Sequence, residues 1–185
     1  MKIVLGGSRQ IHSIPQELVH LIEHWVEAKC EFLVGDAPGA DSAFQKALKK
    51  LQVQAVTVYS SAGYVRNNFD NWPSIHVDSA LKSKSNSRHA FKDRAMTAEA
   101  DLGLMLWDCE SAGTLSNAID MVESNKSCKI WVGPDSELYS FDNIESLNGW
   151  LNLYPEVGTE ARKRLKIYRQ RKRKRLKESQ PELFD

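Results

Sequence analysis

The chain has 185 residues, of which 42% are hydrophobic and 26% charged, values typical of a globular protein with one domain. No apolar run is long enough to cross a membrane, and the first residues lack the apolar core of a signal peptide. The three cysteines, Cys30, Cys109 and Cys128, are far apart, which argues against a disulfide scaffold or a zinc ribbon. We therefore expect a cytoplasmic protein with reduced thiols, no metal site and no required cofactor.

The net charge of +1 conceals an uneven distribution of charge along the chain. Residues 162–177 contain eleven lysines and arginines and no acidic residue. Since the whole chain has 25 basic and 24 acidic residues, the remainder of the chain is acidic. An acidic body followed by a basic segment suggests two separate roles, which we consider in turn.

Apolar runs and helical periodicities alternate along the sequence. In chain order we predict a strand at 2–5, a helix at 15–29, a strand at 32–34, a helix at 41–51, a strand at 55–59, a long loop at 60–90, a helix at 89–100, a strand at 101–107, a helix at 113–125, a strand at 129–132, a helix at 143–153 and a basic helix at 160–177. Uniformly apolar strands that alternate with helices predict an α/β fold with a Rossmann-like, doubly wound, mostly parallel sheet of about five strands. The expected organisation is a Rossmann-like domain at 1–155, a basic C-terminal helix at 156–178 and a flexible tail at 179–185.

Three loops that follow predicted strands have compositions suited to ligand binding. In such sheets, ligands bind beyond the carboxyl ends of the strands. The loop at 6–9 combines two glycines with Arg9, so backbone amides and a guanidinium could meet an anion there. The loops at 35–41 and 108–114 also run from an apolar strand into a helix. Convergence of the three loops predicts a phosphate-binding site, and for the loop at 6–9 an ordinary turn with a surface arginine is the alternative.

Two carboxylates of the second loop have different expected roles. Asp41 stands at the predicted start of a helix and is better explained as its cap than as a ligand contact. Asp36 beside a phosphate-type loop would be unfavourable unless it binds a hydroxyl group, such as that of a ribose.

The glycine patterns of ordinary dinucleotide enzymes and P-loop proteins are absent. Instead, Gly7-Ser8-Arg9, Pro38-Gly39-Ala40-Asp41 and the stretch from Ala100 to Asp108 with Ser111-x-Gly113-Thr114 resemble the SLOG superfamily. This Rossmann-like group includes the LOG phosphoribohydrolases and the Rossmann domain of DNA-processing protein A. The resemblance covers about residues 2–133.

The resemblance implies a nucleotide or nucleotide-derived ligand, of the nucleoside phosphate, NAD or ADP-ribose type. It also implies a basic residue near the phosphate, in a helix where Lys92 and Arg94 both stand, and it suggests a homodimer. A sensor linked to nucleic-acid metabolism is the function expected. The predicted ligand-binding residues are Gly6, Gly7, Ser8, Arg9, Gly35, Asp36, Gly39, Arg94, Asp108, Ser111, Gly113 and Thr114.

One departure from the resemblance bears on catalysis. LOG enzymes carry a catalytic glutamate in P-G-G-x-G-T-x-x-E, and the corresponding residue here is Asn117, whose amide cannot take up a proton as a carboxylate does. An N-glycosidic nucleotide hydrolase or ribosyl transferase is therefore the alternative function. In that case Asp36 or Glu110 would serve as the acid/base.

The basic segment and the last residues suggest a DNA-associated protein as a third interpretation. Cations without compensating acids indicate DNA or RNA binding, with a solvated helix as the alternative. The predicted contacts are Arg162, Lys163, Arg164, Lys166, Arg169, Arg171, Lys172, Arg173, Lys174 and Arg175. Residues 180–184 resemble the Q-x-x-L-F peptide that binds the bacterial sliding clamp, with Gln180, Leu183 and Phe184 as its anchors and a frayed tail as the alternative.

Overall fold

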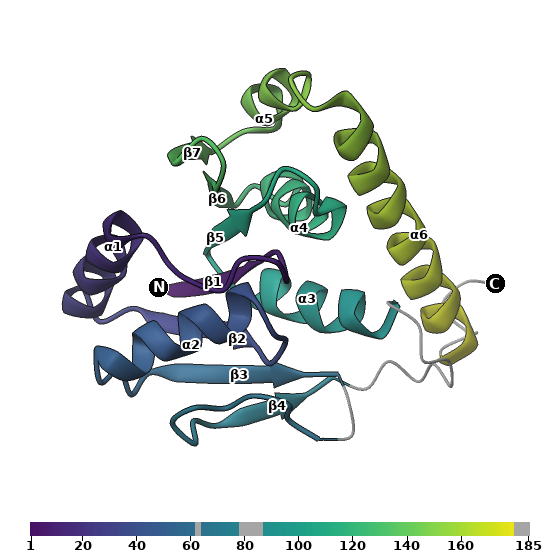
Figure 1. The fold of residues 1–185 in the computed structure, drawn as a ribbon. Coiled ribbons are helices and arrows are strands. Elements are labelled where there is room, and N and C mark those ends of the chain that lie inside the picture. The colour runs from purple at the N-terminus through teal and green to yellow at the C-terminus, as the bar shows by residue number, and fades with distance from the viewer. Residues whose placement is uncertain (62–63, 78–86, 180–185) are drawn as a thin grey trace.

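A computed structural model describes residues 1–61, 64–77 and 87–179. Within that part of the chain, a seven-stranded sheet runs through the molecule with helices on both faces (Figure 1). The strands are β1 (Lys2–Gly7), β2 (Glu31–Gly35), β3 (Val56–Ser60), β4 (Ser74–His76), β5 (Leu102–Trp107), β6 (Ser127–Val132) and β7 (Glu137–Phe141).

The order of the strands is β4-β3-β2-β1-β5-β6-β7, and all neighbours are parallel except β6 and β7. From β1 the chain builds outward through β2 and β3, then returns to the other side of β1 with β5. The reversal places a topological switch point between β1 and β5, and in open α/β sheets ligands bind in the crevice outside the carboxyl ends of the strands at such a point.

Two hydrophobic cores lie on opposite faces of the sheet. Helices α1 (Gln16–Glu27) and α2 (Ala40–Lys50) cover one face, where Leu18 and Phe44 are fully buried. Helices α3 (Ser87–Glu99), α4 (Ala112–Glu123), α5 (Ile144–Leu151) and α6 (Pro155–Ser179) contribute to the other core, in which Leu115 and Trp107 are fully buried. Figure 1 shows α6 running alongside α4 and past the end of α3.

The predicted α/β class and doubly wound, mostly parallel sheet are confirmed, but the sheet has two more strands than expected. β4 lies inside the segment predicted to be a loop, and its three exposed residues pair only with β3, so no hydrophobic pattern marks it. β7 forms an antiparallel hairpin with β6 across residues 133–136, which read Gly-Pro-Asp-Ser. That turn composition is a recognisable hairpin signal.

Helix α6 begins earlier than predicted, at Pro155, whose fixed φ suits the first turn of a helix. Ala161 and Leu165 are buried in the same core as α4, and the ring of Tyr168 packs edge-on against Phe91 at 5.0 Å. Residues 169–174 are exposed. The first half of α6 therefore belongs to the core, whereas the following stretch of basic residues lies on the surface.

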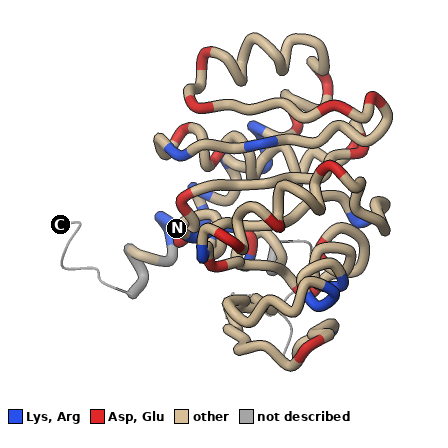
Figure 2. Tube along the Cα trace, turned by 90° about the vertical axis from the view of Figure 1, so that its left-hand side faces the viewer, with Lys and Arg blue, Asp and Glu red and all other residues tan. Residues whose placement is uncertain are grey.

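The remaining surface carries most of the acidic residues. Figure 2, which views the molecule from the side away from α6, shows acidic positions spread over the body. Among the helices of the described ranges, none is long and apolar enough to cross a membrane.

Candidate ligand site at the carboxyl edge of the sheet

The three loops singled out in the sequence meet at the switch point. Ser8, which is buried, donates a hydrogen bond from its hydroxyl to the Asp108 carboxylate and so links the loops after β1 and β5. The Ala40 N–H donates to the Ser8 carbonyl at 3.0 Å, which joins the loop before α2 to the same point. Gly39 has a φ of +83°, and a Cβ there would lie 2.4 Å from the backbone of Arg9. Only glycine allows these two loops to approach so closely.

A second close approach lies directly at the crevice. A Cβ on Gly7 would come within 2.3 Å of the Leu106 carbonyl oxygen on β5. Since real Cβ atoms do not approach carbonyl oxygens so closely, a side chain at this position would push β1 and β5 apart.

A small cavity of about 60 Å³ lies at this point. Its wall contains the predicted residues Gly6, Gly7 and Arg9 together with Asp41, His89, Lys92, Asp93 and Asn117, among others. Pockets that enclose drug-sized ligands measure roughly 300–1,000 Å³, so this cavity admits a group the size of a phosphate and not a whole nucleotide.

Lys92 is the central charge of the site. Its side chain is only 2% exposed, and its ammonium lies 3.1 Å from the Asp41 carboxylate, 3.6 Å from that of Asp93 and 3.7 Å from that of Asp36. Burial acts to lower the pKa of Lys92, but the three carboxylates outweigh burial and raise it, so Lys92 stays charged. A Cβ on Gly35 would lie 2.2 Å from the Lys92 ammonium and 2.0 Å from an Asp41 oxygen, so glycine makes room for this pair.

Asp36 is completely enclosed by the protein and is paired with Arg66. The Arg66 guanidinium donates to both carboxylate oxygens, at 3.0 and 2.5 Å, and the Arg66 backbone N–H adds a third hydrogen bond. Burial acts to raise the pKa of Asp36, but the bonds from Arg66 and the charge of Lys92 outweigh burial and lower it. Asp36 is thus a buried structural anion, and the ribose hydroxyl predicted for it has no access.

Like Asp36, Asp41 is engaged by groups of the protein itself, but it is not the cap of α2 that the sequence predicted. Gly39 occupies the N-cap position of α2, and Asp41 accepts the Ala37 N–H at 3.1 Å and the Lys92 ammonium. Its carboxylate therefore holds the loop before α2 onto α3.

Arg9 and His89 are the groups best placed to meet a ligand. Arg9 is exposed, and neither its guanidinium nor its backbone N–H has a partner in the described part of the chain. The Ser61 hydroxyl lies 2.9 Å from His89 Nδ1. Burial, followed by the charges of Arg9, Arg66 and Lys92, lowers the pKa of His89, so this imidazole is neutral at pH 7.

Arg94 lies on a different face of α3 from Lys92 and does not line the cavity. Its guanidinium donates to the Ser116 carbonyl at 2.8 Å and to the Ser116 hydroxyl, approaches Asp120 at 3.4 Å and stacks over Tyr168. Residues two apart on a helix point about 200° apart, so only one of the two cations can face the sheet. The structure gives that position to Lys92.

The third loop mainly builds the start of α4. Asp108 accepts the backbone N–H groups of Glu110 and Ser111, and the Ser111 hydroxyl accepts the Thr114 N–H as the cap of the helix. Gly113 faces Arg164 of α6 at 3.8 Å from its ideal Cβ. Of the residues in α4, only Asn117 belongs to the wall of the cavity within the described chain, and Glu110 does not.

Sequence reasoning named Lys92 only as an alternative to Arg94, and it did not single out Arg66, His89 or Asp93. Lys92 stands four residues before Met96, but Arg94 stands four residues before Ala98, so helical spacing does not choose between the two cations. Asp93 is the next residue after Lys92 on α3 and lines the same cavity. Arg66 had no such signal, because it lies in the segment 60–90 predicted to be a loop, and His89 stands at the first position of the helix predicted at 89–100.

The other predicted contacts lie elsewhere or outside the described residues. Arg162, Lys166, Arg169 and Arg173 line a separate groove on α6, whereas Lys163, Arg164, Arg171, Lys172 and Lys174 occupy other exposed positions of that helix. The side chain of Arg175 and the tail residues Gln180, Leu183 and Phe184 are not among the described ones. In the same part of the chain, no cluster of three or more His, Cys, Asp or Glu residues could hold a metal ion.

Comparisons with family models, curated proteins and solved structures found no match to this chain. The resemblance to the SLOG superfamily therefore stays a prediction, and the function is argued from the geometry of the site.

Proposed function

We propose that the protein binds a nucleotide-derived ligand, of the nucleoside phosphate, NAD or ADP-ribose type, at the switch-point cavity. The observation that carries this proposal is that groups able to bind an anion and groups able to bind a hydroxyl line the same small cavity. Arg9 offers a guanidinium and a backbone N–H without partners among the described residues. Asp93, 29% exposed, pairs with Lys92 at 3.6 Å and retains lone pairs that can accept from a hydroxyl.

In this arrangement the phosphate lies against the guanidinium and the backbone N–H of Arg9, because the neighbouring N–H groups of Ser8 and Gln10 already donate to the Leu106 carbonyl and to the Ser8 hydroxyl. The rest of the ligand lies at the mouth of the cavity. Lys92 contributes through its charge, but its contacts with three carboxylates leave little of that charge to hold an anion alone. The mixed character of the wall suits a ligand that carries both phosphate and sugar hydroxyls better than a bare anion.

Binding without turnover is the form of the function that the residues favour. The two candidates for acid/base catalysis are poorly placed, since Asp36 is engaged by Arg66 and Glu110 lies outside the cavity wall. Asn117 does line the cavity, but its amide cannot exchange a proton in catalysis. N-glycosidic hydrolysis and ribosyl transfer therefore lack a general acid/base among the residues predicted for that role.

The proposal is tested by measuring the melting temperature with AMP, ADP-ribose, NAD and inorganic phosphate. A ligand that binds only the folded state raises the melting temperature. We expect at least one nucleotide to do so and Arg9→Ala to weaken its binding by about tenfold or more, because a charged hydrogen bond is lost. Arg171→Ala removes an exposed arginine that is not part of the cavity wall and should bind as the wild type does.

Chromatography of the same mixtures decides between binding and hydrolysis. We expect the added nucleotide to be recovered intact, and release of a free base or a ribose phosphate would favour the enzyme instead. Absence of any thermal shift, or an equal shift in the Arg9→Ala protein, would contradict a ligand site at this cavity.

A further inference from the structure

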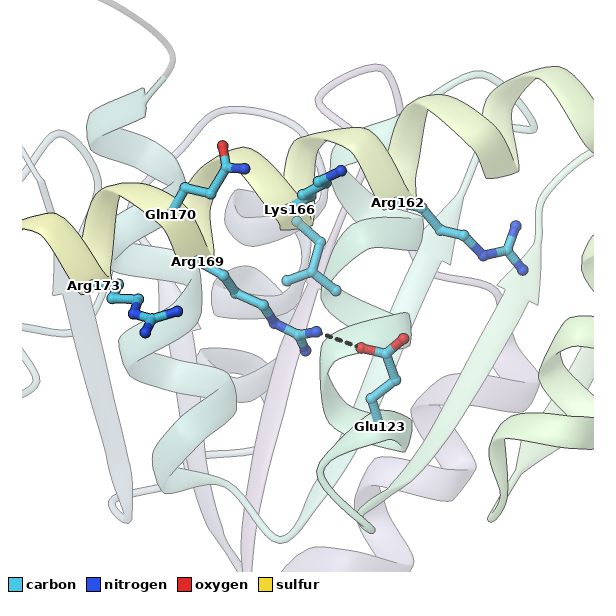
Figure 3. Close-up of a pocket in the computed structure, with 7 residues that line it drawn as sticks. Glu123, Arg162, Lys166, Arg169, Gln170 and Arg173 are labelled. Atoms are coloured by element: carbon cyan, nitrogen blue, oxygen red, sulfur yellow. Dashed lines mark ion pairs between the residues drawn. The ribbon is translucent and has the colours of Figure 1, made fainter.

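A groove lined mainly by basic residues lies between α6 and the end of α4, and it shares no lining residue with the switch-point cavity. Its volume is about 390 Å³, and it is lined by Glu123, Arg162, Leu165, Lys166, Arg169, Gln170 and Arg173 (Figure 3). All of these except Glu123 come from α6.

The four cations of the groove form one stripe along the helix. Arg162, Lys166, Arg169 and Arg173 are spaced by four, three and four residues, which places them on one side of α6. At 1.5 Å of rise per residue the stripe is about 16 Å long. The stripe adjoins the buried side of α6, marked by Leu165, so the body of the protein forms its second wall.

The acidic residues near the groove neutralise only one of its cations. Arg169 is held by Glu123 at 2.7 Å and by Asp120 at 3.0 Å. Arg162 donates to the neutral amide of Asn148. Lys166 and Arg173 form no ion pair with any residue in the described ranges. The groove therefore keeps an excess of positive charge while Arg169 is fixed in position.

The lining also restricts which polyanion suits the groove. Proteins that bind single-stranded nucleic acids combine a basic groove with aromatic side chains on which the bases stack. None of the described residues that line this groove is aromatic. Duplexes hide their bases and present two rows of phosphates, which exposed lysines and arginines contact without stacking.

We propose that this groove binds the phosphate backbone of a double-stranded nucleic acid, independently of its base sequence. Lys166 and Arg173 contact phosphates, Arg162 supplies a further cation, and Arg169 braces α6 against α4. This role goes beyond the ligand proposed for the cavity and does not depend on it, because the two sites share no lining residue.

The test is fluorescence anisotropy with the full chain and two DNA duplexes of unrelated sequence, each of 20 base pairs or about two turns. A single-stranded oligonucleotide of the same number of bases serves as the comparison. We expect similar affinity for both duplexes and weaker binding of the single strand. The variant Lys166→Gln/Arg173→Gln should lose about tenfold or more in affinity. Affinity falls as salt rises, and each phosphate contact contributes about 0.9 to the magnitude of the slope of log affinity against log salt. Loss of two contacts should therefore make the slope shallower by about two.

The matched control is Lys46→Gln/Lys50→Gln, which removes two exposed cations from α2 on the opposite face of the sheet. It should retain the wild-type affinity and slope, and circular dichroism should show all three proteins folded. The proposal is overturned if the groove variant and the control bind alike, if the single strand binds as tightly as the duplexes, or if polyglutamate displaces the duplex at equal charge concentration.

Discussion

Lys92 and Lys166 carry the same charge in opposite surroundings. Lys92 is buried beneath the crevice, and three carboxylates within 3.7 Å of its ammonium compensate its charge. Lys166 lies on the surface of α6 and pairs with no acid among the described residues. The first lysine serves the stability of the loops around a site, whereas the second leaves its charge available for binding.

The contrast teaches that charge by itself does not locate a binding site. A buried ion pair holds its partners in place, and removing one member leaves the others unsatisfied. An exposed cation adds little to stability, since water and salt screen it, and it is free to contact a polyanion. The two regions should therefore respond very differently to the same kind of substitution.

The largest effect is expected for Lys92→Met, which removes the buried cation and leaves its three carboxylates close together. The free energy of unfolding should fall by about 3–5 kcal/mol, measured by urea denaturation. Lys50→Met at an exposed position should change it by less than about 0.5 kcal/mol. Equal stability of the two variants would mean that the buried cluster does not hold the loops.

Gly35→Ala is expected to have the next largest effect. The new Cβ would lie 2.0 Å from Asp41 and 2.2 Å from Lys92, so the ion pair must shift, at a cost of about 1–3 kcal/mol. Gly149→Ala is the matched control, because nothing lies within 4 Å of its Cβ and alanine favours the helix by up to about 1 kcal/mol. A stabilised Gly35→Ala protein would contradict the tight fit around this pair.

A smaller effect should appear in the dependence of stability on pH. The pKa of Asp36 is lowered in the folded protein, so its pairing with Arg66 stabilises the fold above the ordinary aspartate pKa of about 3.9. That contribution is lost as the pH falls through the folded-state pKa. The difference in unfolding free energy between the wild type and Asp36→Asn should therefore shrink from about pH 5 downward through this range. A difference that stays constant would remove Asp36 from the pH response.

The smallest effect on stability is expected for Lys166→Gln/Arg173→Gln. Both residues are exposed, and neither forms an ion pair in the described part of the chain, so the unfolding free energy should change by less than about 0.5 kcal/mol. Urea denaturation of this variant beside Lys92→Met measures the contrast directly. A loss above about 2 kcal/mol would place these two cations with the structural charges of the cavity.

The sequence predicts the sheet better than the site because the two depend on different information. Apolar strands such as Leu102–Trp107 alternate with amphipathic helices, and these periodicities determine the architecture without knowledge of distant contacts. Gly7 and Gly39 were also recognisable, because glycines between a strand and a helix often permit close approach.

The pairings within the site could not be predicted, because they join distant positions. Asp36 meets Arg66 across 30 residues, and Lys92 meets Asp41 across 51. Asp36 looked like a ligand contact only because its partner belongs to a segment without periodicity. Lys92 and Arg94 could not be separated either, because each stands four residues before an apolar residue and both are buried in the structure.

The packing of α6 limits how the chain can be shortened. Ala161 and Leu165 fill the space over α4, while Tyr168 covers Phe91 and the Arg94 guanidinium. A truncation before residue 155 would expose this apolar surface and leave the buried Arg94 guanidinium without the ring that covers it. A fragment that keeps this apolar contact must therefore extend to Tyr168, and one that also keeps the ion pairs between α6 and α4 must include Arg169.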